Sequence, residues 1–178
     1  MTRRVIPVVA LMMMFAGCGG NDQKTSGTIT LSSDLYDGGS YYYAMGLSFD
    51  EAGEVPTLPD QYRADIILGA GPVEGGPVVA YLTANTYKPP FALAGTYDSE
   101  SLAKSAFSEL KSVGSYSWVE FASPLAANQI WVVKTRDSKY AKLRIISVIL
   151  NTSVTPAAAT CTLEWVWQPD GSSTFPAK

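Results

Sequence analysis

The sequence predicts a mainly β domain, an antiparallel two-sheet sandwich with one α-helix. From Thr28 onward the chain is made of short runs rich in Val, Ile, Tyr, Trp and Thr, which suit a pleated, half-buried surface. Glycine and proline clusters such as Gly75-Gly76-Pro77 separate these runs and indicate turns. A single segment has the apolar spacing of a helix. Many short strands with turns between them and one helix are typical of a packed antiparallel β domain.

The first 17 residues have the pattern of an export signal. Arg3 and Arg4 form a basic start, and Val5 to Ala16 is an apolar stretch too short to span a bilayer as a stable helix. The end of this stretch, Phe15-Ala16-Gly17-Cys18, resembles the lipobox of bacterial lipoproteins. That resemblance implies cleavage before Cys18 and attachment of lipid to its thiol. An ordinary secretory signal with an incidental Cys18 is the alternative.

The expected organisation is therefore a signal peptide at 1–17, a lipidated Cys18 with a flexible tether through 27, and a single domain over 28–178. The tether is expected because residues 19–27 are polar and glycine-rich. We expect a bacterial cell-envelope location, held to the membrane by the lipid on Cys18. The next residue is Gly19 rather than Asp, which favours the outer membrane.

Composition excludes several classes of function. The chain has no histidine, the commonest metal ligand and general base, so we expect no metal site, no cofactor and no catalytic activity. Without Arg3 and Arg4, the chain has 11 basic and 16 acidic side chains. This acidic balance argues against nucleic acid as a partner. Beyond Cys18 the only thiol is Cys161, which we expect to pack in the core as a small apolar group.

Eight segments are expected to be strands. They are 28–32, 41–49, 62–68, 78–83, 115–121, 129–135, 140–150 and 161–168. Gly69-Ala70-Gly71 is interpreted as a turn, and the acidic stretch from Asp50 to Glu54 as a solvated loop.

The helix is expected near 99–113. Its apolar residues recur on one face: Leu102, Ala103, Ala106, Phe107, Leu110 and Val113. Asp98 or Ser99 can cap its first turn, and Gly114 lies where a glycine would end it.

The clearest local prediction is a β-hairpin over 130–150 that turns at 136–139. On its return strand one face carries Ala141, Leu143, Ile145 and Ile149, and the other carries Lys142 and Arg144. Five basic residues belong to this hairpin: Lys134, Arg136, Lys139, Lys142 and Arg144. Two interpretations stay open, a solvated outer face that discourages edge pairing and a patch for an anionic partner.

Aromatic side chains are the other candidates for contact with a ligand. Trp165 and Trp167 share one face of the last predicted strand, and Tyr41, Tyr43 and Met45 lie together on an early one. Such residues either complete a core or, when exposed, form a platform for a flat ligand or a sugar ring.

Four segments of the chain resemble the HmuY-like family. They are the hairpin Trp131 to Ile145, the strand Cys161 to Gln168, and the early segments Tyr41 to Phe49 and Arg63 to Leu68. The resemblance implies an exported, lipid-anchored, β-rich protein, and its best-known members capture haem. Those members hold the iron with paired histidines or methionines. Here histidine is absent and Met45 is the only methionine after residue 17, so neither pair can form.

The expected function is a non-catalytic surface module that binds an unassigned small molecule or glycan. Two alternatives remain. One is a haem- or porphyrin-binding protein that uses non-histidine contacts, for which Met45 is the candidate ligand. The other is a structural or assembly lipoprotein that docks onto another envelope protein.

Overall fold

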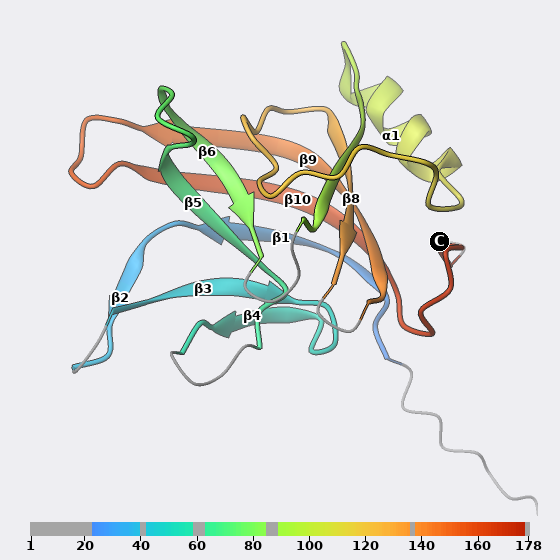
Figure 1. Ribbon diagram of the computed structural model, residues 1–178, viewed down its shortest axis with the longest axis horizontal. Coiled ribbons are helices and arrows are strands. Elements are labelled where there is room, and N and C mark those ends of the chain that lie inside the picture. The colour runs from blue at the N-terminus through green and yellow to red at the C-terminus, as the bar shows by residue number, and fades with distance from the viewer. Residues whose placement is uncertain (1–22, 40–41, 59–62, 85–88, 136–137, 177–178) are drawn as a thin grey trace, which may run out of the picture.

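The computed structural model describes residues 23–39, 42–58, 63–84, 89–135 and 138–176 (Figure 1). The signal segment, Cys18, Tyr41 and Arg136 lie outside these ranges. In chain order the elements are β1 (Ser26–Ser32), β2 (Leu35–Asp37), β3 (Tyr42–Ser48), β4 (Gly53–Pro56), β5 (Ile66–Pro72), β6 (Val78–Thr83), β7 (Phe91–Thr96), α1 (Glu100–Glu109), β8 (Gln129–Lys134), β9 (Tyr140–Asn151) and β10 (Ala158–Gln168).

The strands form two antiparallel sheets, which confirms the predicted fold class. The first sheet has the order β1-β10-β9-β8-β7. The second has the order β2-β3-β5-β6, with β4 paired to β3. The main core fills the space between the sheets. Its largest fully buried side chains include Trp165, Trp167 and Phe49.

The helix α1 covers the outer face of the first sheet, beside β8 and β9 (Figure 1). A second, smaller core lies beneath it, made by Phe107, Ile130, Val132, Val166 and Phe175. The first sheet is therefore buried on both faces where α1 lies. This explains why β8 is a continuous apolar run rather than an alternating one.

The helix is shorter than predicted. Ser99 caps it, its Oγ accepting a hydrogen bond from the Leu102 N–H at 3.3 Å, and the last helical bond runs from Leu110 N–H to Ala106 O. Beyond it, Val113 N–H donates to Ser173 O and Phe175 N–H donates to Lys111 O, both at 2.8 Å. The chain after α1 thus pairs with the C-terminal segment, and these bonds replace the predicted last turn.

The predicted apolar face of the helix is also partly wrong. Ala103 and Phe107 are buried, but Leu102 is 55% exposed. The face that packs on the sheet is narrower than the apolar stripe in the sequence.

Seven predicted strands are present, as β1, β3, β5, β6, β8, β9 and β10; β6 has the predicted bounds, and the bounds of the other six are shifted. Three further short strands, β2, β4 and β7, were not predicted. The prediction of a turn at Gly69-Ala70-Gly71 is wrong, since these residues lie inside β5. Glycine is needed at position 69 because the ring of Tyr81 on β6 packs where a Cβ would lie. Glu54 likewise belongs to β4 rather than to a loop.

The predicted hairpin is β8 and β9, and a bulge alters the far end of β9. Ile145 pairs with Leu163, but Ser147 pairs with Thr162, so Ile146 is an extra residue on β9. The extra residue reverses the facing of later side chains. Val148 therefore packs against the core, and Ile149, predicted to share a face with Leu143 and Ile145, is 67% exposed.

The segment predicted as a strand at 115–121 is irregular. Val119 in this segment forms an isolated bridge with Phe91 of β7, and Ala122, just beyond it, forms another with Leu82 of β6. Because β7 and β6 are edge strands of different sheets, residues 112–125, here called the clasp, join the two sheets along one side. The alternating, aromatic-rich sequence suits such edge pairing as well as a regular strand.

Candidate functional site

A cavity of about 760 Å³ lies beside the clasp. Its walls come from the β5–β6 turn, from β7 and from the clasp, and β8 supplies part of its base. The lining residues are Val73, Glu74, Pro77, Val79, Leu93, Ser115, Tyr116, Ser117, Val119, Glu120, Phe121, Ser123, Pro124 and Trp131. Its volume is in the range of small-molecule sites, about 300–1,000 Å³.

Backbone hydrogen bonds hold the clasp wall in place. Val119 N–H donates to Phe91 O at 2.7 Å, and Phe91 N–H donates back to Val119 O at 3.1 Å. A second reciprocal pair joins Leu82 and Ala122, with both bonds at 3.1 Å. These paired bonds attach the clasp to the edge strands β7 and β6, so this wall of the cavity is held by backbone hydrogen bonds at two points.

The base of the cavity is organised by one glutamine. The Gln129 Oε1 atom accepts hydrogen bonds from the Trp131 indole Nε1–H and from the Ala126 N–H, each at 3.0 Å. Its Nε2 group donates to Pro124 O at 3.1 Å. The side chain therefore orients the Trp131 ring and holds the end of the clasp at the same time.

The rim is acidic and hydroxylic. It carries the carboxylates of Glu74 and Glu120 and the hydroxyls of Ser115, Ser117 and Ser123. Glu74 lies in the β5–β6 turn, where Glu74 and Gly75 have φ of 52° and 76° and Gly76 N–H donates to Val73 O at 2.9 Å. Positive φ at both central residues is the type I′ geometry of tight hairpins, which usually takes Asn or Gly.

This cavity was not predicted from the sequence. Its walls come from three segments that are distant in the chain, and one of them was interpreted as a regular strand. The signals that could have drawn attention to it are the Glu74-Gly75-Gly76 turn and the aromatic run around Trp118.

The structure does not bring the predicted aromatic contacts together at an accessible surface. Trp165 and Trp167 are 1% and 2% exposed, so they complete the core and form no platform. Tyr43 is half-buried and stacks on Tyr36, with ring centroids 5.6 Å apart. Met45 is half-buried on β3 opposite Pro56, away from the cavity described above, and Tyr41 lies outside the described residues.

The predicted basic patch is corrected for its two central residues. Lys142 and Arg144 are 4% and 5% exposed, so they form neither a solvated face nor a surface for an anionic partner. The helix α1, which the hairpin sequence alone does not reveal, covers them. Lys134 is half-buried beside Trp118 and Tyr140, and Arg136 lies outside the described residues.

Protein groups, rather than water, partner both side chains. The Lys142 Nζ donates to Phe107 O at 2.6 Å and to Leu110 O at 2.8 Å, at the end of α1. Arg144 Nε donates to Glu164 Oε2 at 2.8 Å, and its Nη1 lies 3.8 Å from Glu100 Oε1. These charges join the helix to the sheet.

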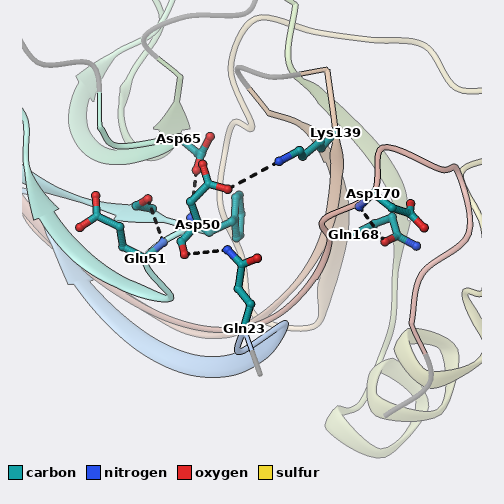
Figure 2. A network of polar contacts seen from close by, with 9 residues as sticks. Gln23, Asp50, Glu51, Asp65, Lys139, Gln168 and Asp170 are labelled. Carbon is teal, nitrogen blue, oxygen red and sulfur yellow. Dashed lines mark hydrogen bonds and ion pairs between the residues drawn. The ribbon is translucent and has the colours of Figure 1, made fainter. Parts of the chain in front are cut away.

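Lys139, just before β9, is tied into a polar network (Figure 2). Its Nζ lies 3.8 Å from Asp50 Oδ1 and 5.0 Å from the centre of the Trp167 ring. Gln23 Nε2 donates to Asp50 O at 3.0 Å, and Asp65 Oδ2 accepts from Phe49 N–H at 2.9 Å. The network joins the start of the described chain, the β3–β4 turn and the β8–β9 hairpin.

Cys161 is fully buried in the main core, as predicted, and is not in a disulfide. Burial raises the pKa of its thiol from 9.0 to about 12, so the thiol stays protonated at neutral pH. Such a thiol is a poor nucleophile.

Within the described residues, no cluster of three or more Asp, Glu or Cys side chains could hold a metal ion. Nor does any helix within those ranges have the length and apolar character needed to cross a bilayer.

No family model matches the chain, and no curated protein matches it.

Proposed function

We propose that this protein is a non-catalytic, lipid-anchored module of the bacterial cell envelope, with an HmuY-like domain that binds a small ligand in the cavity beside the clasp. The observation that carries the proposal is the cavity itself, which joins apolar and aromatic walls to a few polar rim groups. That combination is typical of ligand sites. Its serine hydroxyls have no histidine to activate them, since the chain contains none, which supports binding rather than catalysis.

The anchor part of the proposal rests on the n-region, the short apolar stretch and the lipobox-like Ala16-Gly17-Cys18. Cys18→Ser is expected to release the protein from the membrane fraction, because the thiol that carries the lipid is lost. The release is measured by detergent phase separation, as the fraction of wild type and of Cys18→Ser that enters the detergent phase. Identical partition of wild type and variant would contradict the anchor.

The cavity part is tested by what co-purifies with the native protein. Mass analysis of small molecules released from the wild type is compared with the same analysis of Leu93→Arg, which places a long cation at the mouth. Leu93 is 44% exposed on the edge strand β7, so this change leaves the core intact. Leu102→Arg on α1, where Leu102 is 55% exposed, is the matched control. A ligand lost only in Leu93→Arg supports the site, and one retained in both variants refutes it.

A second candidate function, docking onto another envelope protein, is favoured by a different surface. Large apolar side chains are exposed where β9 ends and where β1 leads into β2: Leu35, Ile149, Leu150 and Val154. Exposed apolar groups of this kind mark contact sites in some soluble domains. Cross-linking from Val154→Cys to a neighbour in intact cells would support this function. The same cross-linking from an exposed site on α1 would count against it.

Haem capture is the remaining alternative. Met45, its candidate ligand, is not among the residues that line the cavity beside the clasp. Haemin titration of the wild type and of Met45→Ala tests it. Tight binding that Met45→Ala abolishes would establish haem capture and displace the proposal above.

A further inference from the structure

We infer that a second copy of this chain pairs along the exposed end of β9, so that the first sheets of two molecules join into one continuous sheet. The two strands run antiparallel, and the pairing is centred on Ile149. Three features support this contact: an unpaired backbone edge, exposed apolar side chains, and the absence of charge around them. The contact is separate from the cavity beside the clasp and does not depend on a ligand there.

The last residues of β9 have a neighbouring strand on one side only. Within the described residues, β8 pairs with β9 from Tyr140 to Arg144, and the last bond on that side runs from Asn128 N–H to Ile145 O at 2.9 Å. On the other side, β10 pairs with β9 up to its end at Asn151. The hairpin of β9 and β10 reaches beyond β8 (Figure 1). Residues 147–151, here called the free edge, therefore form an exposed edge of the first sheet.

The direction of the backbone groups in the free edge follows from the pairing of β10. Ala159 directs both of its groups toward β1, since Ser33 N–H donates to Ala159 O at 2.9 Å and Ala159 N–H donates to Ser33 Oγ at 2.7 Å. Ala159 lies opposite Leu150. In an antiparallel ladder, opposite residues either bond to each other or both point away. Leu150 and, by alternation, Val148 therefore direct their N–H and C=O groups away from β10, toward the open side.

The free edge lacks the usual protection of exposed strands. Lysine, proline and bulges normally prevent the addition of another strand to a sheet edge. Residues 145–163 contain no Asp, Glu, Lys or Arg, and their only proline, Pro156, lies in the turn after β9. The bulge at Ile146 precedes the free edge, which pairs regularly with β10. An uncharged edge of this kind is suited to the addition of an extended strand.

A second copy of the chain fits this edge. With 16 acidic and 13 basic side chains, two copies carry net charge of the same sign, but their free edges can meet without opposing charges of one sign. A two-fold axis at Ile149 places Val148 of each copy opposite Leu150 of the other. Each such pair can exchange two backbone hydrogen bonds, because both residues point to the open side. The same surface then serves both molecules, as in most symmetric dimers.

The two Ile149 side chains meet at the centre of this register. They form a pair without hydrogen bonds, in which the Cα atoms lie about 4.5 Å apart and the side chains are close. Ile149 is 67% exposed, more than any other large apolar side chain in the described residues. Pairing would remove this surface from water in both copies, which favours the contact.

Disulfide trapping of the full-length protein in intact cells measures both the contact and its register. Under mild oxidation, Ile149→Cys is expected to form a disulfide-linked dimer. Ser147→Cys and Asn151→Cys should each remain monomeric when expressed alone, because the register keeps identical residues at these positions apart. The two variants should link to each other when they are expressed together, since position 147 of one copy then faces position 151 of the other.

Two proteins control for other links. Leu102→Cys places a thiol on α1 at a side chain that is 55% exposed, so it measures random collisions. The wild type keeps Cys18 and Cys161 and measures any link through the native thiols. Neither is expected to give the dimer that Ile149→Cys gives.

Sedimentation equilibrium of the purified full-length protein in density-matched non-ionic detergent measures the strength of the contact. Ile149→Lys is expected to weaken the dimer at least about tenfold, because two like charges would face each other at its centre. Leu102→Lys makes the same change on α1 and should leave the dimer intact. Unchanged tryptophan fluorescence of Ile149→Lys would show that its fold is preserved.

Four outcomes would overturn the inference. A wild type that is monomeric at every concentration measured would exclude the dimer, and a dimer that Ile149→Lys leaves intact would place the contact elsewhere. Equal cross-linking of Ile149→Cys and Leu102→Cys would show only collisions. A link from Ile149→Cys to a different protein would make the free edge a docking site for that protein and exclude pairing between copies.

Discussion

Lys142 shows how one buried charge can join two elements. Its position on β9 places the ammonium under the end of α1, where helix carbonyls lack internal partners and carry partial negative charge. The rings of Phe107 and Phe175 lie 4.7 Å and 5.3 Å from the same nitrogen. The cost of burying the ammonium is offset by two carbonyls and two aromatic faces.

Lys142→Ala is expected to lower the free energy of unfolding by about 3 kcal/mol, because charge-assisted hydrogen bonds are lost and buried carbonyls are left unpaired. Lys142→Met keeps the apolar stem and should lose about half as much. Urea denaturation followed by tryptophan fluorescence measures both. Lys104→Ala, at an exposed site on α1, is the control. A Lys142→Ala variant as stable as this control would show that the contact contributes nothing.

Cys161 provides a pH dependence at the same scale. Burial raises the pKa of the Cys161 thiol to about 12, against 9.0 for a thiol that is not buried, so folding favours the protonated thiol. Its contribution is complete below about pH 9 and is lost as pH rises from 9 toward 12, because the unfolded chain releases this proton first. The stability difference between wild type and Cys161→Ala should therefore shrink over that interval. A difference that stays constant would contradict the burial of the thiol.

The burial of Cys161 could be predicted from the sequence, because a free cysteine in a strand usually packs as a small apolar side chain. The burial of Lys142 and Arg144 could not be predicted in this way. The alternation along β9 correctly placed Lys142 and Arg144 on the face of the strand opposite to that of Leu143. Alternation does not tell, however, whether other elements cover that face. The continuous apolar run of β8 was the available signal that the outer face is also buried.

At the scale of elements, local signals set where structure begins, and tertiary pairing sets where it ends. Ser99 caps α1 as predicted, whereas pairing with the C-terminal segment ends the helix before Gly114. The β5–β6 turn shows the opposite balance. Its type I′ geometry is imposed on Glu74, whose intrinsic preference opposes it.

Glu74→Asn is expected to raise the free energy of unfolding by about 0.5–1 kcal/mol, because asparagine tolerates the left-handed region. Glu74→Gln removes the same charge without relieving the backbone and should bring no such gain. Thermal unfolding of the three proteins measures the difference. An equal gain in both variants would attribute the effect to charge rather than to turn geometry.

At the scale of the whole molecule, the sequence was sufficient for the fold class, the hairpin and seven strands, because each of these follows from local periodicity. The clasp could not be predicted in this way. Residues 115–121 have the composition of a strand, but Val119 and the adjoining Ala122 each pair at a single point with a different sheet edge. Whether this segment pairs as one strand or bridges two edges depends on the distance between the sheets, which local sequence patterns do not predict. The candidate cavity depends on the same distance.

The clasp yields the last prediction. In Val119→Pro the N–H that donates to Phe91 O is removed, so the clasp should detach from β7 and expose the edge between the sheets. Hydrogen exchange at the amides of Phe91 and Leu82 is expected to rise about tenfold, while exchange in β10 stays slow. Val119→Ala keeps the N–H and removes the side chain, so it should protect both amides as the wild type does. If Val119→Pro leaves them protected, the two sheets are held together by their core alone. If it exposes them and also abolishes ligand binding, one segment both joins the sheets and forms the wall of the site.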